Sequence, residues 1–334
     1  MRLRLAVLLA TLAVGAAGSN DAGAQPPVIG LITKTETNPF FVKMKEGAEA
    51  AAKANGARLL SGAGKNDGDN AGQVTAMENM IAAGARVILI TPSDAKAIVP
   101  AVNRARAKGV LVIALDSPTD PESVTDALFA SDNYRAGVLI GQYAKAALGG
   151  RPAKIATLDL FPGNPVGARR HNGFLKGFGL AAPDARSNTL GAPPEVVCMA
   201  DSYGDRAKGQ TGMENCLQKA PDINVVYTVN EPTAAGAYKA LKAAGKEKGV
   251  VLVSVDGGCQ GIRDVRAGAI AATAQQYPLR MASLGVAAGV AFLKTGRKPS
   301  GYTDTGVTLI AGKPVKGVES GSVETGMESC FGRK

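Results

Sequence analysis

The chain has 334 residues, a formal net charge of +10, four cysteines, one histidine and no tryptophan. That length predicts about two domains with sizeable cores. The basic residues are scattered and form no run, which disfavours a nucleic-acid-binding protein. Because no CxxC pair exists and only one histidine is present, a structural zinc site is also disfavoured, and we expect no metal and no cofactor.

The N-terminus has the pattern of a secretory signal peptide. Arg2 and Arg4 precede the apolar stretch 5–17, which is too short to span a bilayer, and Ala22-Gly23-Ala24 is a small-residue cleavage site. We therefore expect residues 1–24 to be removed, with cleavage near Ala24. The mature protein is expected to be soluble and exported.

Strand and helix patterns alternate through the mature chain. In the first half we predict strands over 28–32, 57–60, 87–90, 110–115 and 127–130, and helices over 41–55, 69–83, 95–108 and 133–148. After a break at 149–152 the pattern restarts, with strands over 154–158, 196–199, 225–229, 250–255 and 270–275, and helices over 166–179, 205–219, 234–244, 262–267 and 278–293. This alternation is typical of βαβ units and predicts an α/β protein with doubly wound parallel sheets.

The stretch Asn38-Pro39-Phe40-Phe41 follows the first predicted strand. We place it in a strand-to-helix loop, at the carboxyl end of the strand, where parallel α/β sheets bind ligands. In the simpler interpretation, Asn38 caps the helix, Pro39 starts it, and the two aromatic rings belong to the core. In the alternative, the rings offer flat apolar faces beside a polar amide, an arrangement that suits a sugar ring.

Polar side chains follow several predicted strands. Asp116, Asn230 and Asp256 each come directly after an apolar strand, and Arg170 lies on the helix after strand 154–158. A single residue of this kind is usually a helix cap. Several of them in both halves predict a shared cleft, in which carboxylate, amide and guanidinium groups bind hydroxyl oxygens.

Catalytic patterns are weak. The chain contains no GxxxxGK[ST], GxGxxG, HExxH or GxSxG motif. His171, the only histidine, follows two arginines on a predicted helix, and we interpret it as a surface or cleft-edge residue. Glu36 and Asp116 are an acid–base pair in principle, but nothing in the sequence sets the distance between them. We therefore expect a binding protein rather than an enzyme, with an exported sugar-modifying enzyme as the alternative.

The four cysteines, an even number in a chain with an export signal, predict two disulfides. Three connectivities are possible. We favour Cys198–Cys216 and Cys259–Cys330 because the partners are near in sequence and because the second pair would clamp the C-terminal tail to a loop.

Several short segments of the chain match those of a known protein family, in the same order along the sequence. The matching segments are 38–41, 90–94, 112–116, 131–133, Arg170 with Gly173-Phe174, 229–231, 255–257 and 272–278. With them, the mature chain resembles the periplasmic sugar-binding proteins of the ribose-, pentose- and hexose-binding type, which serve ABC transporters. Segments 33–41 and 254–259 look most like the fructose-binding component of rhizobial fructose importers.

The resemblance implies a type I periplasmic binding protein with two lobes, joined by three chain crossings, that close on a monosaccharide. It implies a first lobe of residues 25–131 plus 277–307 and a second lobe of residues 132–276 plus 308–334. The ligand would be a monosaccharide, with fructose foremost and ribose or another pentose or hexose as alternatives. The implied partner is an ABC-transporter permease, and a chemoreceptor is a further candidate. A monomer is expected. The effector domain of a sugar-responsive repressor shares this fold, but here an export signal stands in place of a DNA-binding helix-turn-helix.

Carried over position by position, the resemblance assigns a ligand set. Phe40 and Phe41 would sandwich the sugar ring. The residues that would bind its hydroxyl groups are Asn38, Asp116, Arg170, Asn230, Asp256 and Gln276. Two departures argue against ribose: Ser117 stands where ribose binders carry an arginine, and Tyr203-Gly204 stands where they carry an aromatic residue. Phe161 and Tyr203 are further stacking candidates.

Overall fold

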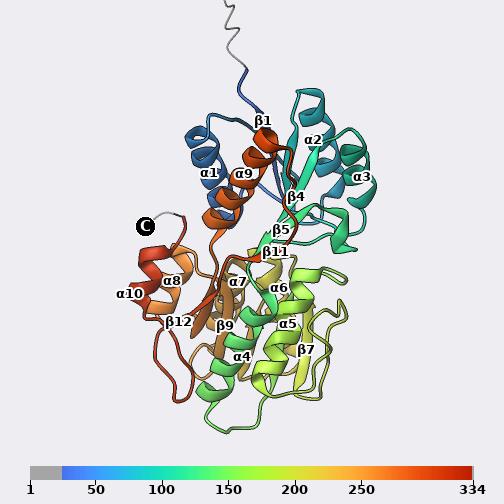
Figure 1. Cartoon of the computed structure of the whole chain (residues 1–334). Coiled ribbons are helices and arrows are strands. Elements are labelled where there is room, and N and C mark those ends of the chain that lie inside the picture. The colour runs from blue at the N-terminus through green and yellow to red at the C-terminus, as the bar shows by residue number, and fades with distance from the viewer. Residues whose placement is uncertain (1–24, 333–334) are drawn as a thin grey trace, which may run out of the picture.

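The computed structural model describes residues 25–332, so the predicted signal peptide lies outside the described residues. The described chain forms two six-stranded sheets, in the orders β11-β5-β4-β3-β1-β2 and β12-β10-β9-β8-β6-β7. Figure 1 shows the two sheets, each with its helices, one above the other. We call them the first lobe and the second lobe.

The elements divide between the lobes as follows. The first lobe holds β1 (Val28–Thr33), α1 (Pro39–Ala54), β2 (Arg58–Ala63), α2 (Asn70–Ala82), β3 (Val87–Ile90), α3 (Val99–Ala107), β4 (Leu111–Leu115), the 3-10 turn η1 (Glu122–Val124), β5 (Ala127–Ala130), α9 (Pro278–Thr295) and β11 (Gly301–Asp304). The second lobe holds α4 (Asn133–Leu148), β6 (Ile155–Asp159), α5 (Pro165–Phe178), β7 (Val196–Asp201), α6 (Arg206–Lys219), β8 (Val225–Thr228), α7 (Glu231–Ala243), β9 (Val251–Asp256), α8 (Cys259–Arg266), β10 (Ala272–Gln275), β12 (Thr308–Ala311) and α10 (Val323–Ser329).

The central strands are apolar throughout because helices cover both faces of each sheet. In β3, Leu89 packs in the cluster with α1 and α9, whereas its neighbours Ile88 and Ile90 pack in the cluster with α2 and α3. All strand pairs are parallel except β10 with β12. The predicted class of two doubly wound α/β lobes is therefore confirmed.

The two lobes repeat one plan. If β1–β5 are matched to β6–β10, the strand orders coincide. The first loop also repeats, because Asn38 caps α1 and Asn164 caps α5, and each is followed by proline. The carboxyl ends of corresponding strands therefore face one another across the junction between the lobes.

The chain passes between the described lobes at three places: from β5 to α4, from β10 to α9 and from β11 to β12. These are the three crossings predicted for the fold. The residue boundaries given above for the lobes stay a prediction, and the last described residues have contacts in both lobes, as shown below.

Some elements differ from the sequence prediction. Helix α1 begins at Pro39, so Phe40 and Phe41 lie in its first turn rather than in a loop. Helix α3 begins at Val99, four residues later than predicted. Strands β11 and β12 and helix α10 were not predicted; all four residues of β11 are exposed, and such a strand has no apolar pattern to mark it.

Helices α4 and α5 pack with their backbones in close contact. A Cβ atom at Gly137 would lie 2.1 Å from the carbonyl oxygen of Arg170, and one at Gly173 would lie 2.2 Å from that of Tyr134. Only glycine permits this approach. The position of Arg170 along α5 is therefore fixed against α4.

Both favoured disulfides are present, Cys198–Cys216 and Cys259–Cys330, and the described residues contain no free cysteine. The first links β7 to α6 inside the second lobe, and the second links the start of α8 to the chain after α10. Within residues 25–332, no helix combines the length and the apolar character that a membrane span requires.

Candidate functional site

A cavity lies between the two lobes at the carboxyl ends of their strands. Its lining residues are Lys34, Asn38, Phe40, Phe41, Asp67, Asp116, Leu160, Val166, Arg170, Asn230 and Asp256. All predicted ligand residues except Gln276 belong to this set. They come from both lobes, so a molecule held here would contact both.

The first turn of α1 contributes an amide and two aromatic rings. Oδ1 of Asn38 accepts a hydrogen bond from the Phe40 amide at 3.0 Å, so Asn38 is both the helix cap and a cavity residue. Phe40 and Phe41 are 3% and 4% exposed and belong to the core of the first lobe while also lining the cavity.

The predicted sandwich of a sugar between Phe40 and Phe41 is wrong in this conformation. Their ring centroids are 5.3 Å apart and their planes meet at 87°, which is an edge-to-face contact. Rings that touch each other leave no gap for a third ring. The apolar surface supplied from the opposite lobe comes instead from Leu160 and Val166.

The two other stacking candidates pair with each other. Phe161 and Tyr203 stack with centroids 5.4 Å apart, and the Lys208 ammonium lies 3.7 Å from the centre of the Tyr203 ring. Neither aromatic residue is among those that line the cavity.

The strand-end aspartates adopt unusual backbone angles. Asp116 has a φ of +60° and Asp256 a φ of +142°, a region that residues other than glycine rarely occupy. Strain of this kind persists where the surrounding structure enforces it, often at functional sites. The two residues follow β4 and end β9, which are equivalent strands, so both lobes use the same device to turn a carboxylate into the cavity.

Asp116 retains an unused acceptor. Its Oδ2 accepts a hydrogen bond from the Ser117 hydroxyl at 3.0 Å, but its buried Oδ1 has no partner among residues 25–332. Buried polar atoms in native proteins are nearly always paired. An unpaired carboxylate oxygen on a residue that lines a cavity therefore indicates a site for an external donor, such as a hydroxyl group.

Arg170 is held on three sides. Its Nε donates to Oδ1 of Asn133 at 2.7 Å, and its Nη1 donates to the Val229 carbonyl at 2.9 Å and lies 3.8 Å from Oδ1 of Asp256. The side chain is 5% exposed. These contacts orient the guanidinium toward the cavity without using all of its five N–H donors.

Asn230 and Gln276 play different parts. Asn230 caps α7 through the Thr233 amide at 3.1 Å, donates to the Gly204 carbonyl at 3.1 Å, and lines the cavity. Gln276 is buried and is not among the residues that line the cavity, and its Nε2 donates to Oδ1 of Asp256 at 3.0 Å. In this structure Gln276 therefore contacts the cavity residue Asp256, and its contact with a ligand stays a prediction.

Burial sets the protonation of the carboxyl groups around the cavity. Burial raises the pKa of Asp256, and the Arg170 guanidinium opposes part of that shift. Burial and the nearby Asp256 carboxyl raise the pKa of Glu231, although the carboxylate accepts hydrogen bonds from the Gly257 and Gly258 amides, each at 2.8 Å. Hydroxyl donors that enter the cavity would favour the ionised form of Asp256.

His171 is not a surface residue, which corrects the sequence interpretation. It is fully buried in the second lobe, with Nδ1 2.9 Å from Oδ1 of Asp159 and Nε2 2.7 Å from the Gly191 carbonyl. The Gly191 carbonyl can only accept, so Nε2 carries a proton, and a second proton on Nδ1 is stabilised by the Asp159 carboxylate. Burial alone would lower the pKa of His171, but the Asp159 carboxylate and the Gly191 carbonyl outweigh it and raise the pKa.

The acid–base pair considered from the sequence has no support from the structure. Glu36 is exposed and does not line the cavity that Asp116 lines. Within the described range there is also no group of three or more histidine, cysteine, aspartate or glutamate side chains placed to hold a metal ion.

Residues 29–298 match the sequence model of the family described as periplasmic binding protein domain. The chain belongs to this family. Its two-lobed fold is the one that the family resemblance predicted, and the cavity described above lies between the two lobes.

The relatives of this periplasmic binding protein include named sugar binders. The ribose import binding protein of Haemophilus influenzae is 34% identical over 87% of this chain and 94% of its own length. That of Escherichia coli is 33% identical over 90% of this chain and 95% of its own. A solved solute-binding protein of an ABC transporter from Actinobacillus succinogenes, with bound D-allose, is 25% identical, covers 86% of this chain and 98% of its own, and has a TM-score of 0.75.

These relatives are binding proteins rather than enzymes. The resemblance to the periplasmic sugar-binding class, stated from the sequence, is therefore confirmed at the level of the family.

Sequence reasoning missed some cavity residues. Lys34 is 2% exposed and lies in the segment 33–41 that carried the resemblance, so that segment contained a signal. Asp67 lies in the loop between β2 and α2, where the surrounding glycines and asparagine predict an ordinary turn. Both residues line the cavity, where burial raises the pKa of Asp67 and the nearby Lys34 ammonium opposes the shift.

Proposed function

We propose that this periplasmic binding protein captures a monosaccharide between its lobes and delivers it to the permease of an ABC transporter. The observation that carries the proposal is the convergence, in one interlobe cavity, of an arginine, three amide or carboxylate groups from the first lobe, two from the second lobe and two aromatic rings. Such a set pairs hydroxyl groups with charged partners and covers C–H surface with rings.

The balance of charge favours a neutral polyhydroxylated ligand. Lys34 and Arg170 bring positive charge to the cavity, and Asp67, Asp116 and Asp256 bring carboxyl groups. An acidic ligand would meet these carboxyl groups, and an amine would meet the two cations. Hydroxyl groups can donate to the carboxylates and accept from the cations in the same complex.

Fructose is the ligand we propose first. Support comes from segments 33–41 and 254–259, which look most like the fructose-binding component of rhizobial importers. Within those segments, Lys34, Asn38 and Asp256 line the cavity. Ribose binders carry an arginine at the position of Ser117, and this difference argues against ribose as the ligand. Ribose and allose are the second candidates, because relatives of this chain are named for them.

The proposal includes export to the periplasm with the signal peptide cleaved near Ala24, action as a monomer, and docking on a membrane permease. A chemoreceptor that reads the sugar-loaded form is a further proposed partner. The signal peptide pattern at residues 1–24 and the family membership support the location.

Isothermal titration calorimetry tests the proposal. The protein is unfolded, dialysed and refolded to remove bound sugar, and then titrated with D-fructose, D-ribose, D-allose, D-mannose, D-galactose and D-glucose. We expect one sugar to bind with a dissociation constant near micromolar, about −8 kcal/mol. Failure of all six sugars to bind would contradict the proposal. NMR of the recovered ligand should show unchanged sugar, and turnover would indicate an enzyme instead.

A further inference from the structure

The chain after α10 belongs by its backbone to the second lobe. Cys330 is disulfide-bonded to Cys259 at the start of α8. The Cys259 amide donates to the Phe331 carbonyl at 2.7 Å, and Gly258 and Phe331 form a parallel bridge. The disulfide of Cys330 and the backbone pairing of Phe331 together fix the position of residue 331 against α8.

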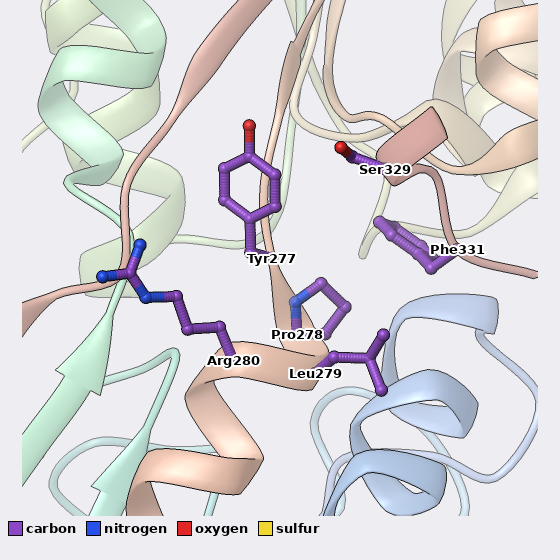
Figure 2. A pocket seen from close by; sticks show the side chains of 6 residues that line it. All are labelled: Tyr277, Pro278, Leu279, Arg280, Ser329 and Phe331. Atoms are coloured by element: carbon purple, nitrogen blue, oxygen red, sulfur yellow. The ribbon is translucent and has the colours of Figure 1, made fainter. Parts of the chain in front are cut away.

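The side chain of Phe331 nevertheless lies in the first lobe. It is 3% exposed and is part of the core cluster built from β1, β3, β4, α1 and α9. Its ring centroid is 5.7 Å from that of Phe40, with the planes at 78°. Figure 2 shows the ring beside Pro278 and Leu279, which begin α9, with Tyr277 and Arg280 further along the same apolar pocket of about 190 Å³.

This geometry couples the lobes near the ligand cavity. The disulfide prevents the tail from leaving α8, so a separation that moves α1 away from α8 withdraws the Phe331 ring from Phe40. Withdrawal exposes apolar surface to water and is unfavourable. The ring also packs against Phe40, a wall of the cavity, on which it stabilises one orientation through an edge-to-face contact.

We propose that Phe331 is a positioning residue and an interlobe latch, held on the second lobe by the Cys259–Cys330 disulfide so that its ring supports Phe40 and favours the closed conformation. The expected effect on sugar affinity rests on the proposed function. The expected effect on lobe closure does not, because it rests only on the contact of Phe331 with the first lobe.

The test uses two pairs of variants in the full mature protein. Phe331→Ala removes the ring, and Phe331→Leu keeps an apolar side chain. Cys259→Ser with Cys330→Ser releases the tail, and Cys198→Ser with Cys216→Ser removes the other disulfide, which lies within the second lobe as the matched control. Each variant is measured by small-angle scattering without sugar, and by calorimetry with D-fructose or with whichever of the six sugars the wild type binds.

For Phe331→Ala and for the Cys259/Cys330 variant we expect a larger radius of gyration without sugar and about tenfold weaker sugar binding, since the closed state is less populated. Phe331→Leu should recover most of the affinity. The Cys198/Cys216 variant should melt at a lower temperature with unchanged affinity and radius of gyration.

The inference is overturned if Phe331→Ala matches the wild type in both measurements, or if the two disulfide variants behave alike. If Phe331→Ala does not fold, Phe331→Leu and the disulfide pair decide. If the wild type binds none of the sugars, the proposed function fails, and scattering without sugar still decides whether Phe331 holds the lobes together.

Discussion

Replacement of Asp116 by asparagine separates ligand binding from stability. Asparagine has nearly the same shape and tolerates the positive φ of +60° that this position requires. The remaining amide oxygen can still accept the hydrogen bond that the Ser117 hydroxyl donates. What the substitution removes is the carboxylate acceptor at the unpaired Oδ1 of this cavity-lining residue.

The magnitude follows from the kind of hydrogen bond that is lost. A bond to a charged acceptor contributes about 1.5–3 kcal/mol and a neutral one about 0.5–1.5 kcal/mol. With the amide oxygen kept on Ser117, the amide nitrogen takes the place of Oδ1 and can only donate a neutral hydrogen bond to a ligand hydroxyl. The difference is about 1–2 kcal/mol, or roughly 5- to 30-fold weaker binding. The stability of the sugar-free protein should be unchanged or higher, because one of several neighbouring carboxyl charges is gone.

Asp126→Asn is the matched control in the same lobe. Asp126 is buried away from the cavity and pairs with Arg106 at 3.0 Å while accepting the Val112 amide at 3.1 Å. Its replacement should lower the melting temperature and leave sugar affinity unchanged. Calorimetry and thermal melts of both variants complete the test. Wild-type affinity in Asp116→Asn, or a marked loss of sugar-free stability in it, would refute the assignment of Asp116 to the ligand.

Three further outcomes are expected. Phe41→Ala should lower both sugar affinity and the sugar-free free energy of unfolding, the latter by about 3–5 kcal/mol, because the ring is buried in the core; denaturant melts check this, and an unchanged melt would contradict the core assignment. The raised pKa of His171 contributes stability that is fully present below the unfolded pKa of about 6.5 and is lost as pH rises through the folded pKa, so melts across pH 6–9 should show a loss that His171→Gln lacks. An Ellman assay on unfolded, unreduced protein should find no thiol, since all four cysteines are paired, and two reactive thiols would contradict the disulfides.

Local patterns were sufficient to predict the fold and part of the site. Asp116 and Asp256 follow apolar strands, and the carboxyl ends of parallel strands gather at one edge, so their convergence follows from topology. Of the three possible cysteine connectivities, the favoured one, chosen for proximity in sequence and a clamped C-terminal tail, is the one present. The two aromatic rings were placed at the correct edge of the sheet, but whether a ring is core or cavity wall depends on its neighbours, and Phe40 and Phe41 are both.

The remainder depends on contacts between distant segments. The burial of His171 requires Asp159 and the Gly191 carbonyl, which no local pattern brings to it. Asp67 lines the cavity because of the conformation of the loop between β2 and α2, which no local pattern predicts. Phe331 is a lone aromatic residue near the end of the chain, and no local pattern predicts that its ring packs in the first lobe while the disulfide at Cys330 holds its backbone on the second.

A crystal structure of the protein with the tightest-binding sugar would decide whether the interlobe cavity is the ligand site. We expect sugar density in this cavity, with hydroxyl groups in hydrogen-bond contact with Asp116, Arg170 and Asp256. A sugar found instead in the larger groove of about 880 Å³ along α1, α7 and α8, out of reach of Asp116 and Arg170, would contradict it.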